Sequence, residues 1–287
     1  MLLECVANIS EGRDVDLIGE LADRAGPTLL DIHSDPEHHR SVLTLGGEAD
    51  PVEAAIRSVA AMAVERIDLR QHQGVHPRLG AVDVVPFVPL GPTGRLDAAV
   101  EARNRFAAWA GADLQLPCFL YGPERSLPEV RREAFLTLDP DTGPPTLHPT
   151  AGAAAVGARP LLVAYNVWIT VTEGSENDAP AAVALARAIA SSIRTPTLRS
   201  LGLAVGTGAQ VSCNLIDPHA GSLAVLYDAI AHLAAEAGGT VERAELVGLV
   251  PGELLAGIPD RRWTELDLSE DRTIESRLES VGVAVSW

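Results

Sequence analysis

The feature that most constrains the fold is an order of apolar segments that occurs twice in the 287 residues. In the first half, hydrophobic spacing predicts strand, helix, strand, strand, helix and strand at residues 2–8, 14–25, 28–31, 41–46, 50–67 and 82–88. The second half predicts the same order at residues 160–169, 178–193, 198–205, 209–215, 222–237 and 241–247. Each half therefore has the order β-α-β-β-α-β, which is the split βαβ pattern of ferredoxin-like units.

We predict an α/β (α+β) protein with two ferredoxin-like βαββαβ subdomains, residues 1–157 and residues 158–287, and a ligand cleft between them. A proline-rich stretch at residues 139–152 marks the connection between the halves. A strand at 116–121 and helices at 96–110, 129–134 and 268–280 complete the prediction. Two single residues give more specific predictions about where elements begin or lie. Asp50 is expected to cap its helix, and Pro86 places its strand near an edge or a bulge.

The charged residues narrow the range of functions. All 22 basic side chains are arginine, which excludes lysine Schiff bases, pyridoxal chemistry and a Walker-A loop. The net charge of -17 argues against nucleic acid and against a membrane surface as partners. An anionic substrate would therefore need a local cluster of arginines, whose planar fork suits carboxylates.

The start of the chain and the cysteines bear on the cellular compartment. The chain opens with a strand-like segment rather than a charged and apolar leader, and no run reaches the ~18 apolar residues of a membrane span. Cys5, Cys118 and Cys213 have neither a disulfide spacing nor a zinc spacing. We expect a cytoplasmic protein.

Histidines are concentrated early in the chain, at positions 33, 38, 39, 72 and 76. His76 stands out because Gly74 and Pro77 restrict its loop and Arg78 follows, an arrangement that positions a general base beside an anion. Two other interpretations stay open. The first is a metal site, since His72 and His76 are four residues apart, although Gly74 and Pro77 disfavour a helix there. The second is a set of ordinary surface histidines.

Further polar positions are less specific. Two of the cysteines fall inside predicted strands and no GxSxG motif occurs, so nucleophilic catalysis is disfavoured. Gln210, Ser212 and Asn214 share one face of a predicted strand, either as a solvated face or as a polar wall of the cleft. Arg159 precedes an apolar strand, where it either forms a salt bridge or holds a substrate carboxylate.

Five segments, in order along the chain, resemble the glutamate formiminotransferase family. They are ECVANISEGR at residues 4–13, GVHPRLGAVDVVPF at 74–87, residues 152–166, AQVSCNL at 209–215 and ELVGLVP at 245–251. Several colinear blocks are far more specific than one short motif.

The resemblance implies a folate-dependent transferase of histidine catabolism and one-carbon metabolism. It would move a formimino group between N-formimino-L-glutamate and tetrahydrofolate, without a metal. His76 matches the histidine of the family's GEHPR loop and would act as the general acid/base. The family fold holds folate in a tunnel between two α/β subdomains, usually in a homodimer. A separate cyclodeaminase is expected, because this sequence does not include that domain.

The resemblance also implies binding residues. The family's folate-contact loop matches Gly143, Pro144, Pro145, Thr146, Leu147, His148, Pro149, Thr150, Ala151 and Gly152. The candidates for substrate binding are Arg40, His39, Arg78, Arg159, Gln210 and Asn214. The arginines among them would be bidentate partners of carboxylates.

Three positions depart from the family pattern. Val75 stands where a glutamate is usual, and His33 and His39 stand where Asp and Asn are frequent. These departures keep two alternatives open: a related hydrolase or formyl-transfer enzyme with an altered acceptor, and a non-catalytic folate-binding protein.

Overall fold

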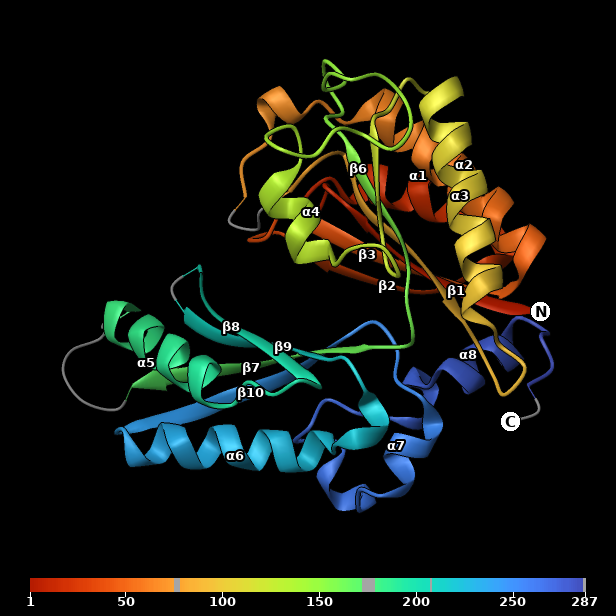
Figure 1. Ribbon diagram of the computed structural model, residues 1–287. Helices are drawn as coiled ribbons and strands as arrows, with labels where there is room; N and C mark the ends of the chain where they lie inside the picture. The colour runs from red at the N-terminus through yellow and green to blue at the C-terminus, as the bar shows by residue number, and fades with distance from the viewer. Residues whose placement is uncertain (75–77, 172–178, 207, 286–287) are drawn as a thin grey trace. The chain divides into compact units, whose positions relative to one another are not determined.

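The computed structural model describes residues 1–74, 78–171, 179–206 and 208–285. The chain divides into two compact units, Met1–Pro160 with Leu278–Trp287 and Leu161–Arg277. Each unit combines helices with one sheet, so the chain is a mixed α/β protein with two sheets (Figure 1). Among the described residues, no helix combines the length and the apolar character that crossing a membrane requires.

The first unit is built on a six-stranded sheet in the order β2-β3-β1-β4-β6-β5. Its strands are β1 (Leu2–Ile9), β2 (Leu29–Asp35), β3 (Arg40–Glu48), β4 (Val82–Pro89), β5 (Cys118–Tyr121) and β6 (Ala154–Ala158). β1 pairs antiparallel with β3 and β4, and β2 pairs antiparallel with β3. β6 is parallel to both β4 and β5. The predicted element order of this half is confirmed; β6 is added beside β4, and the predicted strand at 116–121 is β5, which lies beyond β6.

The helices of the first unit are α1 (Val15–Ala25), α2 (Ala49–Arg66), α3 (Leu96–Asp113) and α4 (Leu127–Glu133). α1 begins as predicted, because the side chain of Asp14 accepts the N–H of Leu17 at 3.0 Å. The predicted cap at Asp50 is wrong. α2 begins at Ala49, so Asp50 lies in the first turn, where a carboxylate is still favourable to the helix dipole.

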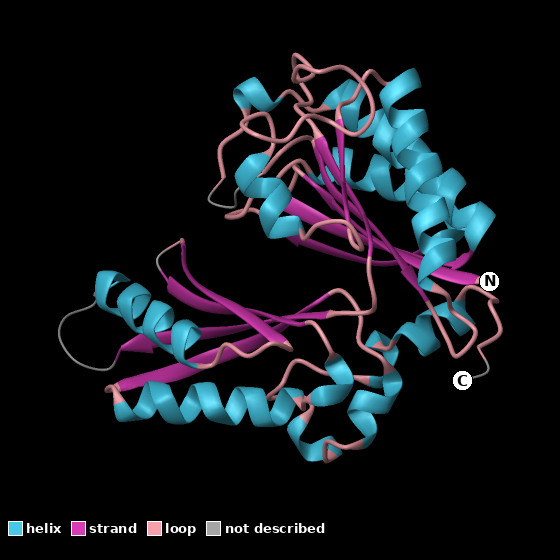
Figure 2. Cartoon of the chain, in the orientation of Figure 1, coloured by secondary structure: helices cyan, strands magenta, loops and turns pink. Residues whose placement is uncertain are grey.

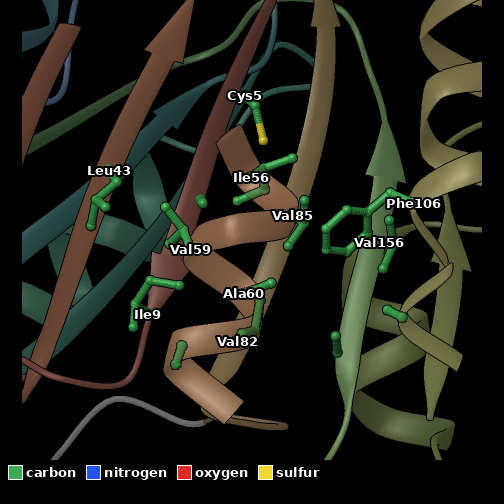
Figure 3. Close-up of a cluster of buried hydrophobic side chains, with 14 of the residues drawn as sticks. Cys5, Ile9, Leu43, Ile56, Val59, Ala60, Val82, Val85, Phe106 and Val156 are labelled. Carbon is green, nitrogen blue, oxygen red and sulfur yellow. The ribbon is translucent and has the colours of Figure 1, made fainter. Parts of the chain in front are cut away.

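One face of the first sheet carries the main apolar core. Cys5 and Ile9 of β1 and Leu43 of β3 are buried together with residues of α2 such as Ile56 and Val59 (Figure 3). α4 packs against β5 and β6 in a second cluster, which contains side chains from the alternate positions of β4 and β6. α1, α2 and α3 therefore cover one face of the sheet, while α4 covers part of the other (Figure 2).

The positions of β4 and β6 correct the sequence analysis. Pro86 does not lie at an edge, because β4 is flanked by β1 and β6. The irregular register between β1 and β4 occurs at Asn8 and Ile9 rather than at the proline. β6 was missed because its residues are alanine, valine and glycine in a short run, and alanine and glycine have low strand propensity.

The second unit has a four-stranded antiparallel sheet in the order β10-β7-β9-β8. Its strands are β7 (Val163–Val171), β8 (Leu198–Val205), β9 (Gly208–Leu215) and β10 (Gly239–Val247), and its helices are α5 (Ala179–Ser192), α6 (Leu223–Glu236) and α7 (Gly252–Ala256). The predicted order is again confirmed, although β7 starts at Val163 instead of residue 160. The domain limits predicted at residues 157 and 158 stay a prediction.

Short 3-10 helices lie at Gly26–Thr28, Leu69–Gln71, Pro218–Ala220, Asp260–Arg262 and Glu270–Arg272. The last of these falls inside the helix predicted for residues 268–280. The α-helix there, α8, is confined to Ile274–Ser280. The prediction was too long because Ser269 and the residues after it form a separate turn.

Gly202 in β8 offers a test of the packing between β8 and α5. A Cβ atom at Gly202 would lie 2.3 Å from the backbone nitrogen of Arg187 in α5. Because a backbone atom cannot rotate away, we expect Gly202→Ala to lower the free energy of unfolding by about 1–3 kcal/mol. A Cβ atom at Gly19 in α1 would have no neighbour within 4 Å, so Gly19→Ala should raise the free energy of unfolding by about 0.5–1 kcal/mol. Urea unfolding measures both; equal effects of the two substitutions would contradict this packing.

Candidate active site

The strand register of the first sheet brings three segments of the chain together at one end of that sheet. Ile9 at the end of β1 lies opposite Ser41 of β3 and opposite Val82 of β4. The residues that follow β1, the β2–β3 turn and the residues that precede β4 therefore lie near one another. The last group contains the histidine loop at residues 72–78. Its predicted catalytic residue, His76, lies outside the described residues.

The β2–β3 turn is held in a defined shape. Asp35 Oδ1 accepts two backbone N–H groups of the turn, each at 2.8 Å. Arg13 Nε donates to the backbone oxygen of Pro36 at 2.8 Å. The turn ends at His39, whose φ of 49° lies in the left-handed region that few non-glycine residues adopt. Such a conformation persists only where the surrounding contacts impose it.

Both ring nitrogens of His39 face hydrogen-bond acceptors. Nδ1 lies 2.9 Å from the backbone oxygen of Gln73, and Nε2 lies 3.0 Å from Glu11 Oε1. Both partners are a carbonyl and a carboxylate oxygen, which only accept hydrogen bonds. Burial alone would raise the pKa of Glu11, but the backbone N–H groups of Asp14 and Arg13 and the charge of His39 outweigh it and lower that pKa. Glu11 is therefore a well-held anion beneath His39.

His72 stacks on His39, with ring centroids 3.8 Å apart and planes 18° from parallel. His72 Nε2 donates to the backbone oxygen of His39 at 3.1 Å. Arg78 Nη1 contacts both ring nitrogens of His72, Nδ1 and, at 2.6 Å, Nε2; because Nε2 carries the hydrogen toward His39, Nδ1 is the nitrogen that accepts from Arg78. A ring that donates at one nitrogen and accepts at the other is neutral. Burial, with the charges of Arg78 and His39, lowers the pKa of His72 to about 4, which agrees with the neutral form.

Arg40, Arg78 and Arg131 lie around one carboxylate, Asp83, which is 1% exposed. Arg131 Nη2 donates to Asp83 Oδ2 at 2.7 Å, and the backbone N–H of Leu79 donates to Asp83 Oδ1 at 2.6 Å. Burial lowers the pKa of Arg40 and of Arg78; Asp83 opposes this change, and neighbouring arginines add to it. The chain thus contains the local arginine cluster that an anionic substrate would need.

Sequence reasoning found Arg40 and Arg78 but missed Arg131. This residue lies in α4, 48 positions after Asp83, and no spacing rule connects the two. One signal was available. An aspartate inside an otherwise apolar strand requires a cationic partner, so Asp83 itself indicated that an arginine lay nearby.

The predicted folate loop, residues 143–152, contacts both flanks of the histidine loop. The N–H of Leu69 donates to the oxygen of Thr150 at 2.9 Å, and the N–H of Ala81 donates to the oxygen of Ala151 at 2.8 Å. Gly152 has a φ of 72°, and a Cβ atom there would lie 2.4 Å from the backbone oxygen of residue 79. Glycine is required for this approach. Two loops that the sequence placed about seventy residues apart are therefore neighbours.

The backbone of Arg159 lies at the other end of β4 from Arg78, while its side chain contacts Tyr121, which Arg131 also influences. The N–H of Arg159 donates to the backbone oxygen of Phe87 at 3.1 Å, and its Nη1 donates to that of Pro160 at 3.0 Å. Phe87 is near the end of β4, whereas Arg78 precedes the start of the same strand. The structure therefore places Arg159 and Arg78 at opposite ends of β4.

In the second unit, Gln210, Ser212 and Asn214 share one face of β9, as predicted. The residues that alternate with them belong to the apolar core shared with α5 and α6. The register places Gln210 opposite Trp168 and Ser212 opposite Asn166 on β7. The polar residues therefore lie on the face of the sheet that points away from α5 and α6.

Glu245 of β10 joins that polar face. Its Oε2 accepts N–H groups from Asn166 at 3.0 Å, Gln210 at 3.2 Å and Trp168 at 3.3 Å. Gln210 is fully buried, so its amide serves to hold this carboxylate. Sequence reasoning missed Glu245, because only the pairing of β10 with β7 brings Glu245 opposite Asn166.

A comparison with known protein families shows to which family the chain belongs. The model described as "Formiminotransferase domain, N-terminal subdomain" matches residues 2–159. The chain belongs to the formiminotransferase family. The matched residues include the histidine loop, the arginine cluster and the predicted folate loop of the first unit.

Individual relatives extend the match over most of the chain. The chain is 34% identical to the glutamate formimidoyltransferase of Streptococcus pyogenes serotype M1, over 90% of this chain and 92% of that protein. It is 32% identical to the glutamate formimidoyltransferase of Thermoplasma acidophilum, over 97% of each. It is 34% identical to the formimidoyltransferase-cyclodeaminase of Gallus gallus, over 87% of this chain and 50% of that protein.

The three cysteines are poorly placed for nucleophilic chemistry in this formiminotransferase. Cys5, Cys118 and Cys213 are buried, and burial raises the pKa of both Cys118 and Cys213 to about 12. These thiols are poor nucleophiles as a result. Within the parts of the chain that the structure describes, no three or more His, Cys, Asp or Glu side chains form a group able to hold a metal.

The contacts of His72 predict a response to acid. The pKa of His72 falls from 6.5 in its ordinary state to about 4 in the folded protein, so the unfolded chain binds more protons between these values. Stability therefore decreases as the pH is lowered from about 6.5 to about 4. The variant His72→Gln lacks this pH-dependent contribution of the histidine. Its free energy of unfolding, measured in urea, should therefore fall less between pH 7 and pH 4.5 than that of the wild type.

The exposed His219, in a short 3-10 helix of the second unit, is the matched control. His219→Gln should follow the wild type across the same pH range. If His72→Gln loses as much stability on acidification as the wild type does, the neutral, half-buried state of His72 is wrong.

Proposed function

We propose that this chain is a glutamate formimidoyltransferase that moves a formimino group between N-formimino-L-glutamate and tetrahydrofolate. Two relatives that carry this enzyme name match nearly the whole chain. The structural observation that supports the proposal most is the arginine cluster around Asp83, next to the loop that matches the family's GEHPR segment. In a protein with a net charge of -17, such a concentration of arginine suits an anionic substrate.

Arg40 and Arg78 are the proposed partners of the substrate carboxylates. N-formimino-L-glutamate is a dicarboxylate, and an arginine fork binds a carboxylate through two parallel N–H donors. Arg131 supports them by its ion pair with Asp83. Arg159 lies at the other end of β4, so we assign it to a carboxylate of the folate tail. Gln210 and Asn214 on β9 remain proposed substrate contacts.

His76 is the proposed general acid/base. Tetrahydrofolate supplies the nucleophilic nitrogen 5, and a histidine with a near-neutral pKa suits proton transfer to and from nitrogen. His76 would take the proton from the attacking nitrogen and return it to the departing glutamate nitrogen. In the sequence His76 is two residues before Arg78. In the structure Arg78 is hydrogen-bonded to His72 and to the backbone oxygen of His38.

The loop at residues 143–152 is the proposed folate contact, and its construction fits that role. Thr150 and Ala151, near its C-terminal end, accept backbone hydrogen bonds from residues 69 and 81. His148 Nδ1 accepts the N–H of Ala151 at 3.0 Å, which fixes the turn from within. The side chain of Leu147 is 55% exposed at the tip, where an apolar group can pack on an aromatic ring.

The architecture around these residues belongs to the same proposal. We assign both units to the ferredoxin-like class, with subdomains at residues 1–157 and 158–287. The antiparallel strand orders β2-β3-β1-β4 and β10-β7-β9-β8 support this assignment. A cytoplasmic location, a homodimer and a separate cyclodeaminase partner complete the proposal.

The transfer reaction itself is the first test. Purified protein is incubated with N-formimino-L-glutamate, with and without tetrahydrofolate, and both 5-formimino-tetrahydrofolate and glutamate are followed. We expect equal amounts of the two products, formed only when folate is present. Release of glutamate without folate would identify a hydrolase. Transfer from N-formyl-glutamate alone would identify a formyltransferase, and folate binding without product would identify a binding protein.

His76→Ala is the matched variant in the same assay. Loss of the acid/base should reduce turnover by at least about 100-fold while folate affinity stays within a few-fold of wild type. His232→Ala, an exposed histidine of α6, serves as the control and should retain activity. Unchanged turnover in His76→Ala would remove this residue from the mechanism.

Arg40→Ala tests the proposed carboxylate contact. A hydrogen-bonded ion pair contributes about 1.5–3 kcal/mol, so we expect KM for N-formimino-L-glutamate to rise about 10- to 100-fold. Arg66→Ala is the control, because Arg66 pairs with Glu20 on an exposed surface, and it should leave KM unchanged. Equal KM values in both variants would exclude Arg40 from substrate binding.

A further inference from the structure

His39 was expected to contact the substrate, but its polar atoms are used within the protein. Nδ1 is paired with Gln73 and Nε2 with Glu11, and one ring face is covered by His72. We infer that His39 is a positioning residue, which orients Arg78 for the carboxylate of the substrate. The inference deepens the proposed function and rests on it.

The first step is the link between the β2–β3 turn and the histidine loop. Three hydrogen bonds cross from one to the other: His39 Nδ1 with the oxygen of Gln73, His72 Nε2 with the oxygen of His39, and Arg78 Nη2 with the oxygen of His38 at 3.2 Å. The partners are 33 to 40 positions apart in the sequence. These contacts therefore fix residues 72, 73 and 78 to the turn and offset part of the conformational entropy that these residues lose.

The second step is the anchor of His39 itself. Glu11 Oε1 forms a hydrogen bond with His39 Nε2 at 3.0 Å. The same oxygen accepts the backbone N–H groups of Gly12, Arg13 and Asp14 at 2.8 to 3.0 Å. The chain at Gly12 passes so near the turn that a Cβ atom there would lie 2.4 Å from the oxygen of Asp35. The Glu11 carboxylate is consequently held in place by its own backbone, whatever His39 does, and it is a preorganised partner for the His39 ring.

The third step leads from His39 to Arg78. The His39 ring supports the His72 ring at 3.8 Å, and the neutral His72 accepts an N–H of Arg78. A Cβ atom at Gly74 would lie 2.6 Å from Arg78 Nη2 and 2.9 Å from the Cβ of His39, so the three residues are in close contact. The plane of the Arg78 guanidinium group thus depends on His72, and the place of His72 depends on His39.

His39→Asn is the decisive variant. Asparagine tolerates a left-handed φ, so the backbone of the turn is retained while the ring that reaches both Glu11 and His72 is lost. We expect KM for N-formimino-L-glutamate to rise about tenfold and kcat to stay within twofold, because only the orientation of a binding group changes. His232→Asn on exposed α6 is the matched control and should change neither constant.

A double-mutant cycle with Arg78→Ala tests the route of the effect. If His39 acts through Arg78, His39→Asn has no further effect on KM in the Arg78→Ala background, whereas independent residues would give multiplied effects. Multiplied effects would overturn the inference. So would a lower kcat at constant KM, or a change in thermal stability alone.

Calorimetric titration with L-glutamate separates this inference from the proposed function. We expect His39→Asn to bind L-glutamate about tenfold more weakly than the wild type. We expect Arg78→Ala and the double variant to bind it with equal affinity. These two results support the positioning role even if no formimino transfer is observed. Equal glutamate affinity in the wild type and His39→Asn would overturn it, even in an active transferase.

Discussion

The buried carboxylate of Asp83 is the group on which the rest of the first unit's site depends. Several arginines converge at one end of a sheet, and both their burial and their mutual repulsion cost free energy. Asp83 accepts hydrogen bonds from Arg131 and from the N–H of Leu79, so one group stabilises the cluster and also fixes the chain directly after the histidine loop. Because Asp83 is surrounded by several guanidinium groups, positive charge is concentrated here despite the acidity of the whole chain.

The two sheets divide their faces between stability and polar chemistry. In the second unit, Tyr165 and Val211 pack with α5 and α6, while Gln210 and Glu245 are hydrogen-bonded on the opposite face. In the first unit the helices cover the core face in the same way, and the ionisable residues gather where strands end or begin. Charged groups in those positions keep their hydrogen-bond partners without interrupting the apolar core. Carboxylates are at the centre of the polar contacts in both units: Asp83 and Glu11 in the first, and Glu245 in the second.

Strong local signals carried over from sequence to structure, and weak ones did not. Asp14 caps α1 because its side chain meets a backbone N–H three residues later, which is a local interaction. β6 escaped prediction because Ala154–Ala158 has little strand propensity and is a strand only through its pairing with β4 and β5. The same missing strand explains the error at Pro86, since without β6 the strand β4 would have been at an edge. His76 was singled out from its neighbours Gly74, Pro77 and Arg78, and its role stays a prediction.

By itself the sequence determined the repeated order of helices and strands, the reliance on arginine as the basic side chain, and the resemblance that led to a formimino-transfer chemistry. These are properties of neighbouring residues or of composition. Only the tertiary structure decided that Glu11, His39, His72 and Arg78 form one connected set, and that Arg131 joins Asp83. The physical reason is the strand register: the pairing of β1 with both β3 and β4 brings together segments that are far apart along the chain, and no local periodicity encodes that pairing.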